Sequence, residues 1–292
     1  MSRGNSKMSK CLIIYFSQNH TTTRVAENIA AGLRRAGYTT QMCNLKNESC
    51  KDLSEYDLVG IGTPVYYFRP PFNIEQFVNW LPNLNKQRFF VFMLHGNYAW
   101  NAYDFIKVTL AKKGAEVVGY FLCRGASYYL GYLKLGYLFS PNHPTIEELT
   151  QAEDFGFQMG NNQPVFVDYK QPPIIYRIER LLTSKWLAQN IYSRLFKVDK
   201  RKCNKCGLCR KVCPTKNIIK GENGFSVWRR NCLLCGMCEL KCPNGAIKSP
   251  VSGFLFRPLQ LYNVKSAAHD PTLNYVKVIH ENGQTKRLEN EK

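Results

Sequence analysis

Eight of the twelve cysteines fall in two runs of identical spacing. Each run separates three cysteines by two residues and adds a fourth, followed by proline, after three more. The runs are Cys203-x-x-Cys206-x-x-Cys209-x-x-x-Cys213-Pro214 and Cys232-x-x-Cys235-x-x-Cys238-x-x-x-Cys242-Pro243. Three thiolates at this spacing reach three corners of one iron–sulfur cubane, while the fourth, turned away before proline, ligates the other. The spacing therefore predicts two [4Fe–4S] clusters and one-electron chemistry.

The crossed arrangement gives each cluster a ligand set drawn from both runs. Cluster I takes Cys203, Cys206, Cys209 and Cys242, and cluster II takes Cys232, Cys235, Cys238 and Cys213. Gly207 and Gly236 let the backbone pass close to a cluster and offer amide hydrogens to its sulfurs. Paired CxxC motifs also bind structural zinc, which is the competing interpretation. Zinc sites do not call for a fourth cysteine before proline in both runs, so the pattern favours iron and sulfur.

Short apolar runs alternate with helical patterns through the N-terminal part of the chain. Such runs are typical of strands buried on both faces of a sheet. We expect strands at 11–16, 58–61, 89–94 and 116–123, and helices at 22–36, 72–81, 101–112 and 145–160. Strands regularly separated by helices predict an α/β fold, a doubly wound parallel sheet with helices on both faces.

Three loops that follow predicted strands are candidates for a ligand site, because open parallel sheets bind ligands beyond the carboxyl ends of their strands. The first loop opens a helix with hydroxyl groups and free amides, which form a natural phosphate site. The candidate residues are Ser17, Gln18, Asn19, His20, Thr21 and Thr22 in the first loop, Thr63, Pro64, Val65, Tyr66 and Tyr67 in the second, and His95, Gly96, Asn97 and Tyr98 in the third.

The three loops resemble those of flavodoxins. The first resembles the flavodoxin phosphate loop, with Gln18 and His20 at its two glycine positions. The second resembles the loop that places an aromatic residue, here Tyr66 or Tyr67, against the isoalloxazine ring. The third resembles the loop that reaches the polar edge of the ring through backbone amides. The resemblance implies one non-covalent FMN.

The cysteine segment resembles the bacterial two-cluster ferredoxins, which form a small α+β domain. Together the two halves resemble the flavodoxin–ferredoxin fusion proteins of anaerobic microbes. The resemblance implies four parts, namely a flavodoxin-like FMN-binding domain at 8–165, a linker at 166–197, a two-[4Fe–4S] ferredoxin domain at 198–250 and a C-terminal extension at 251–292.

This family resemblance implies electron transfer between FMN and the clusters. FMN holds one or two electrons whereas a cluster passes one, so the chain is expected to couple one-electron and two-electron partners in anaerobic metabolism. The sequence shows no catalytic dyad and no Gly-x-Gly-x-x-Gly fingerprint, and no catalytic residue is assigned. A carrier is therefore favoured over the alternative, a reductase that acts directly on a small molecule or a quinone.

The formal charge of +19 permits nucleic acid, anionic lipid or an acidic protein as a partner. The sequence contains no nucleic-acid motif, so we expect an acidic redox protein, such as a ferredoxin or an oxidoreductase. A basic redox sensor that binds nucleic acid or membrane is the third interpretation. The expected docking residues surround the first cysteine run and are Lys197, Lys200, Arg201, Lys202, Lys205, Arg210 and Lys211.

Residues 174–196 follow two prolines and show an apolar stripe beside basic residues at helical period. We expect one amphipathic helix whose apolar stripe packs between the two domains. Peripheral contact with a membrane surface is the alternative.

The remaining features indicate a cytoplasmic protein. No run of about 18 apolar residues occurs, and the first apolar segment is too short for a signal peptide. Eight cysteines are assigned to metal, which argues against a disulfide framework. The scattered Cys11, Cys43, Cys50 and Cys123 are each expected to be small buried or incidental residues.

Overall fold

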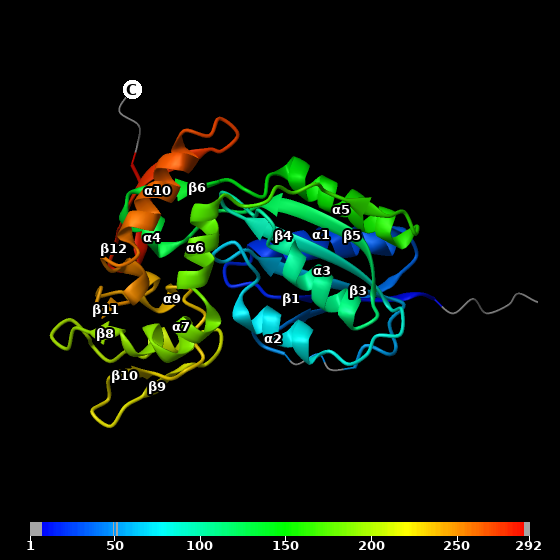
Figure 1. Ribbon diagram of the computed structural model, residues 1–292. Helices are drawn as coiled ribbons and strands as arrows, with labels where there is room; N and C mark the ends of the chain where they lie inside the picture. The colour runs from blue at the N-terminus through cyan, green and yellow to red at the C-terminus, as the bar shows by residue number, and fades with distance from the viewer. Residues whose placement is uncertain (1–7, 49, 51, 289–292) are drawn as a thin grey trace, which may run out of the picture. The chain divides into compact units, whose positions relative to one another are not determined.

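The computed structural model describes residues 8–48, 50 and 52–288 and divides into two compact units (Figure 1). The sheet unit comprises the chain up to Gly125 together with Asn142–Gln171. The cysteine unit comprises Ala126–Pro141 and the chain from Pro172 onward. The segment Ala126–Pro141, which the sequence-based division places in the first domain, thus groups with the cysteine runs.

The sheet unit is built on a six-stranded sheet of order β2-β1-β3-β4-β5-β7. Every neighbouring pair is parallel, as predicted for a doubly wound sheet. Its strands are β1 (Lys10–Tyr15), β2 (Thr39–Asn44), β3 (Leu58–Pro64), β4 (Arg88–His95), β5 (Glu116–Arg124) and β7 (Val165–Phe166). Strands β2 and β7 were not predicted.

Four helices cover this sheet, α1 and α5 on one face and α2 and α3 on the other (Figure 1). They are α1 (Thr21–Arg35), α2 (Phe72–Trp80), α3 (Tyr103–Lys112) and α5 (Ile146–Gly160). The core between the sheet, α1 and α5 is apolar, and the two helices approach so closely that a Cβ on Gly32 would lie 1.9 Å from the Glu153 carbonyl oxygen. Glycine is therefore required at this contact.

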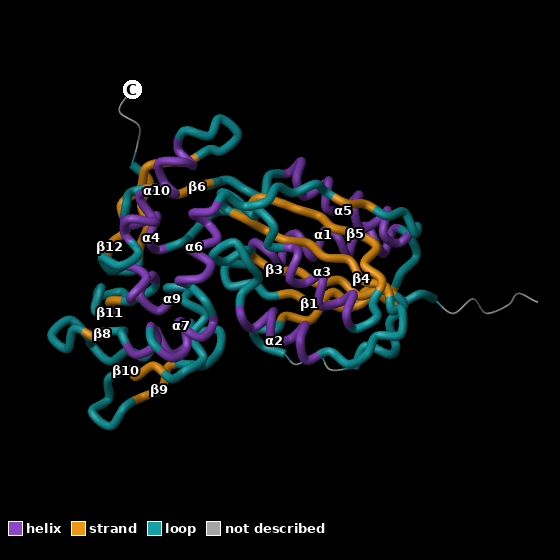
Figure 2. Tube along the Cα trace, in the orientation of Figure 1, coloured by secondary structure: helices purple, strands orange, loops and turns teal. Residues whose placement is uncertain are grey.

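The cysteine unit consists of short elements, as expected for a small α+β domain (Figure 2). Its strands form three small antiparallel sheets, of order β10-β9, β11-β8 and β13-β12-β6. The strands are β6 (Tyr137–Phe139), β8 (Lys197–Val198), β9 (Ile218–Lys220), β10 (Ser226–Trp228), β11 (Ile247–Lys248), β12 (Tyr275–Glu281) and β13 (Gln284–Arg287). The helices are α4 (Leu130–Lys134), α6 (Ile174–Leu182), α7 (Lys185–Asn190), η1 (Tyr192–Arg194), α8 (Leu208–Lys211), α9 (Met237–Leu240), η2 (Pro250–Ser252) and α10 (Arg257–Ala268).

The prediction of one continuous helix over 174–196 is wrong. The structure divides the segment into α6, α7 and the single turn η1. Thr183 donates its side-chain hydroxyl to the Glu179 carbonyl at 2.7 Å, and Ser184 then takes an extended backbone with ψ 154°. Serine and threonine hydrogen-bond to nearby backbone groups and so favour helix ends over helix interiors.

Within the described part of the chain, no helix is long and apolar enough to cross a bilayer.

Two of the four scattered cysteines also differ from expectation. Cys43, in β2, and Cys50 form a disulfide, with their Cα atoms 6.6 Å apart. The turn that follows β2 brings the chain back to the strand, and this proximity cannot be read from the spacing of the two residues. Cys11 and Cys123 are buried in the core of the sheet unit, as expected.

Candidate functional site

The two cysteine runs fold in the same way. In each, a glycine in the left-handed conformation precedes a single-turn helix that carries the third cysteine. Gly207, with φ 74°, precedes α8, and Gly236, with φ 66°, precedes α9. Residues with side chains adopt this conformation at a cost, so glycine suits both positions. The backbone thus repeats along with the sequence motif.

The four cysteines assigned to cluster I line one pocket. Cys203, Cys206 and Cys209 come from the first run, and Cys242 comes from the second. Ser226, on β10, lies in the same pocket and places its hydroxyl 3.0 Å from the Cys209 Sγ. The structure therefore gathers the crossed ligand set around one space.

The four cysteines assigned to cluster II also lie near one another. Burial raises the pKa of the Cys238 thiol, and the nearby Cys235, Cys232 and Cys213 raise it further. Of these neighbours, Cys213 belongs to the first run. Iron is bound by thiolates, so binding must displace the protons that burial favours.

Backbone amides support the two crossing cysteines in equivalent ways. The Asn217 amide donates to the Cys213 Sγ at 3.3 Å, and the Ala246 amide donates to the Cys242 Sγ at 3.2 Å. Both donors stand four residues after the cysteine. Hydrogen bonds to the sulfurs of a cluster stabilise its negative charge and help set its potential.

The two runs differ in their exposure to solvent. Cys206 is exposed, whereas Cys232 and Cys238 are buried. The second run is covered by an apolar cluster in which α4, β6 and β12 pack against α9. We call α4, β6 and β12 the cover. The basic residues around the first run are exposed except Arg210, which is half-buried; the exposed ones are Lys197, Lys200, Arg201, Lys202, Lys205 and Lys211.

Structural zinc is the alternative to iron and sulfur at these cysteines. Among residues 8–48, 50 and 52–288, no three His, Cys, Asp or Glu side chains are placed to share one ion.

The three loops of the flavin hypothesis lie at one edge of the sheet unit. They follow β1, β3 and β4, which are neighbours and parallel. Strand order reverses between β1 and β3, since β2 lies on the other side of β1. Ligands of doubly wound sheets bind at this kind of switch point. The structure therefore brings the three predicted loops together.

The first loop joins a buried serine hydroxyl to the start of a helix. The Ser17 side chain is buried, and its Oγ has no hydrogen-bond partner among the described residues. His20 takes a left-handed backbone with φ 59° and leaves α1 without a side-chain cap or an acidic residue in its first turn. The uncapped amides favour an anion. Asn19 and His20 are exposed and Thr22 is buried, while Thr21 donates to the Asn19 carbonyl at 3.3 Å.

The second loop places Tyr66 toward the first. The Tyr66 hydroxyl donates to the Gln18 Oε1, and its ring meets Phe16 edge-on at 6.5 Å between centroids. Tyr67 has φ 50°, an uncommon value for an aromatic residue. Thr63 is buried and donates to the Pro64 carbonyl at 3.0 Å, and the Val65 amide donates to the Leu94 carbonyl at 2.7 Å.

The third loop is anchored by a neutral histidine. Burial and, to a smaller extent, the positive Arg124 lower the pKa of His95 to about 4, although the hydrogen bond to Asn97 acts in the opposite direction. The His95 Nδ1 lies 3.0 Å from the Asn97 carbonyl oxygen, which can only accept, so Nδ1 carries the hydrogen. The Tyr98 amide donates to the Asn97 Oδ1 at 2.9 Å, and the Tyr98 ring stacks on Trp100 at 4.9 Å between centroids. Gly96 lies between these anchors.

Sequence reasoning missed several residues of these sites. Ser226 lies 17 residues from the cysteine that it contacts, and no spacing rule points to it. Asn217 and Ala246 could have been found, because both follow a Cys-Pro pair at the same interval. Trp100 lies two residues beyond the third loop, so taking the loop as residues 95–100 would have included it.

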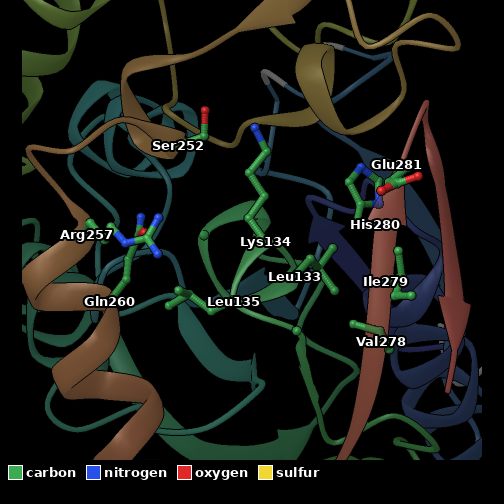
Figure 3. A pocket seen from close by; sticks show the side chains of 12 residues that line it. Leu133, Lys134, Leu135, Ser252, Arg257, Gln260, Val278, Ile279, His280 and Glu281 are labelled. Carbon is green, nitrogen blue, oxygen red and sulfur yellow. The ribbon is translucent and has the colours of Figure 1, made fainter.

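A second pocket of the cysteine unit, of about 370 Å³, lies between α4, α10 and β12 (Figure 3). Lys134 extends from α4 toward Ser252, and both contact the buried Glu239 of α9. Gln260 donates to the Tyr129 hydroxyl and to the Val251 carbonyl. The polar walls of this pocket thus hold the cover against the second cysteine run.

Two family models match separate parts of the chain. A family model described as a flavodoxin domain matches residues 12–132, and one described as a 4Fe-4S dicluster domain matches residues 202–247. An uncharacterized protein of Methanocaldococcus jannaschii is 30% identical over 155 residues, which cover 50% of this chain and 95% of that protein.

Solved structures of flavodoxins are also similar to part of the chain. A flavodoxin from the domain Archaea has a TM-score of 0.42 at 18% identity, covering 53% of this chain and 98% of that one. The two-electron reduced flavodoxin of Megasphaera elsdenii has a TM-score of 0.39 at 18% identity, covering 51% and 98%.

Proposed function

The chain belongs to the flavodoxin–ferredoxin fusion family, and we propose that it relays electrons between two [4Fe–4S] clusters and a bound FMN. When bound, each cluster exchanges one electron, and FMN exchanges one or two. The chain would then couple one-electron and two-electron partners in anaerobic metabolism. The observation that carries the proposal is the pocket that Cys242 shares with three cysteines of the first run.

The cysteine unit supplies the thiolates and the donors around them. In the proposal, Cys203, Cys206, Cys209 and Cys242 hold cluster I, and Cys232, Cys235, Cys238 and Cys213 hold cluster II. The amides of Asn217 and Ala246 and the hydroxyl of Ser226 stand at sulfur atoms, where they offset negative charge. The cysteine unit is thus suited to a group whose charge becomes more negative on reduction.

The sheet unit supplies the proposed flavin site. Ser17 has a buried hydroxyl without a partner among the described residues, beside the uncapped start of α1. In the proposal these groups hold the FMN phosphate, Tyr66 or Tyr67 lies against the ring, and residues 96–98 reach its polar edge. His95 is neutral and bound to Asn97, so it fixes the third loop rather than transferring a proton.

The proposed partner is an acidic redox protein. The cysteine unit contains 24 Lys and Arg against 8 Asp and Glu, counted over Ala126–Pro141 and Pro172–Lys292. Exposed basic residues surround the exposed Cys206. Opposite charge steers diffusional encounter, so an acidic ferredoxin or oxidoreductase is expected to approach cluster I.

Cofactor analysis is the first test. Anaerobically purified chain should contain about eight irons and about eight acid-labile sulfides, with one extractable FMN. Protein that carries no flavin and takes none up in titration would remove the flavin half of the proposal. About two irons per chain would remove the cluster half.

Electron transfer needs a separate test. A Cys206→Ala, Cys235→Ala variant that retains FMN should lose flavin reduction by an acidic ferredoxin, followed in a stopped-flow experiment. Cys123→Ala, which removes a cysteine of the sheet unit, is the matched control. Flavin reduction at the wild-type rate in the double variant would show that the clusters are not the relay.

A further inference from the structure

Helix α6 buries its polar side and exposes its apolar side. Tyr176 and Glu179 face the interior of the cysteine unit, and Glu179 is 4% exposed. The Asn263 amide of α10 donates to the Glu179 carboxylate at 2.7 Å, which fixes this orientation. Ile174 is 76% exposed and Leu181 is 70% exposed. The apolar stripe is therefore largely exposed at these two positions, and its other members Ile178 and Leu182 are exposed to 44% and 39%.

The exposed apolar surface continues beyond α6. Trp186, on α7, is 65% exposed, and Phe254, just before α10, is 88% exposed. Helix α10 runs beside this segment, because Tyr176 contacts Tyr262 at 6.1 Å and Tyr192 contacts Phe256 at 5.2 Å between ring centroids. We define the apolar–basic face as Ile174, Ile178, Leu181, Leu182 and Trp186, together with the basic residues Arg177, Arg180 and Lys185.

The charges on this segment have one sign. Residues 172–198 contain five basic residues, which are Arg177, Arg180, Lys185, Arg194 and Lys197. Their single acidic residue is Glu179, which is buried. All of these residues are described, so the exposed surface of 172–198 carries no carboxylate. Basic side chains accordingly flank exposed leucine, isoleucine and tryptophan.

We propose that the apolar–basic face docks the cysteine unit on an anionic lipid surface. Soluble monomers rarely expose contiguous apolar patches of this kind without a partner. A helix with Trp, Leu or Ile on one side and Lys or Arg beside them lies in the interface of a bilayer, where apolar side chains enter the acyl boundary and basic ones meet anionic headgroups.

An acidic protein fits this face less well than lipid does. It would pair with Arg177 or Lys185, yet large apolar side chains stand between the basic ones. Lipid satisfies both groups at once, since one surface provides the charge and the apolar phase. The face is also separate in sequence from the basic residues around the first cysteine run, which we assign to protein partners.

Vesicle flotation of the intact, cluster-loaded chain tests the proposal. Wild-type protein should float with vesicles of phosphatidylglycerol and phosphatidylcholine and remain unbound with phosphatidylcholine alone. In a Leu181→Glu, Trp186→Glu variant, the affinity for the anionic vesicles should fall by about tenfold or more. Rising salt should weaken wild-type binding, because the basic residues contribute through charge.

The matched control changes two exposed apolar residues of the sheet unit. Val108→Glu, Ile146→Glu removes the same number of exposed apolar side chains and changes the net charge equally. It should float like wild type. The visible absorption spectra of wild type and of both variants should be the same. Absence of wild-type flotation, or equal loss in both variants, would overturn the proposal. A second result would also overturn it. If the Leu181→Glu, Trp186→Glu variant still floats with the vesicles but is reduced more slowly by an acidic ferredoxin, the face is a protein interface.

Discussion

The two cysteine runs share one spacing and one backbone path, yet their surroundings are opposite. The first run presents the exposed Cys206 among exposed lysines and arginines. The second run buries Cys232 and Cys238 beneath the cover, which packs against α9. Only the shared motif is visible in the local sequence, because the cover comes from segments about 100 residues before the second run and about 40 after it.

Two cysteine runs with the same spacing can therefore differ in solvent exposure while their cysteines stay the same. Electron exchange with another protein requires close approach, which the first run allows. The second run is shielded by apolar contacts and by the Lys134–Glu239 ion pair. We therefore expect cluster I to meet external partners and cluster II to be the protected one. Changes at the crossing cysteines, at the Lys134–Glu239 pair and at the exposed lysines would break or sharpen this comparison.

The largest effect is expected from the crossing cysteines. Cys213→Ala should remove cluster II and lower the iron content from about eight to about four atoms, whereas Cys242→Ala should remove cluster I. Low-temperature electron paramagnetic resonance of the reduced proteins distinguishes the remaining cluster, with Cys11→Ala as control. Loss of cluster I in Cys213→Ala would show that each run holds its own cluster.

A smaller effect on stability is expected from Glu179, which lies between α6 and α10. Burial raises its pKa from the ordinary 4.5 to about 7. Between these values the unfolded chain loses the proton while the folded chain keeps it, so stability falls as pH rises and stays low above about pH 7. Glu179→Gln should therefore raise the free energy of unfolding by about 2 kcal/mol at about pH 8.

Urea denaturation followed by circular dichroism measures this change. The gain from Glu179→Gln should shrink as the pH is lowered to about 5.5, where the native carboxyl is protonated. Glu222→Gln, at an exposed position of the same unit, should give little change at either pH. A gain that does not vary with pH would mean that the pKa of Glu179 is ordinary.

The ion pair of the cover should have a more modest effect. Lys134→Met leaves the buried Glu239 carboxylate with only neutral donors, namely the Ser249 amide and the Ser252 hydroxyl. Because Lys134 is partly exposed, we expect a loss of about 1 kcal/mol in the free energy of unfolding. Bleaching of cluster II by an iron chelator should accelerate, while that of cluster I stays constant. Equal acceleration of both would contradict the protective role of the cover.

The smallest effect is expected at the exposed run. Lys202→Gln, Lys205→Gln should lower the association rate of an acidic ferredoxin about two- to threefold at low salt, because steering depends on charge near the docking site. The matched control is Lys265→Gln, Lys277→Gln, which removes the same charge from α10 and β12. Stopped-flow rates that do not change with ionic strength, or that fall equally in both variants, would exclude docking at the first run.

Local patterns predicted much of this molecule. Strands β1, β3, β4 and β5 are nearly continuous apolar runs, because they are buried on both faces, and the sequence predicted each to within a few residues. The loops after β1, β3 and β4 meet at one edge, as parallel strands require. His20, which stands at one of the two glycine positions of the flavodoxin loop, takes the left-handed backbone that glycine adopts most readily.

What the sequence could not predict depends on distant partners. Strand β6 pairs with β12, although β6 has only three residues and Phe139 lies 136 positions before its partner Tyr275. Strand β2 lies at the edge of its sheet and has one buried residue among six, so its apolar signal is weak. The helical spacing of apolar residues in 174–196 continues across Thr183 and Ser184. The helix ends there because of side-chain hydrogen bonding, which the spacing of apolar residues does not reveal.

The amides of Asn217 and Ala246 donate to the two crossing cysteines from the main chain. Every amino acid except proline carries this donor, so the hydrogen bond depends on the backbone rather than on side-chain chemistry, while the burial of Asn217 and Ala246 limits the size of the side chain at each position. If the proposed clusters are bound, part of the control over their reduction potentials therefore comes from the path of the backbone. In homologous sequences we expect proline to be excluded at both positions, a small residue to be kept at 246, and asparagine at 217 to be kept for a further reason, because its Oδ1 accepts from the Asn231 amide.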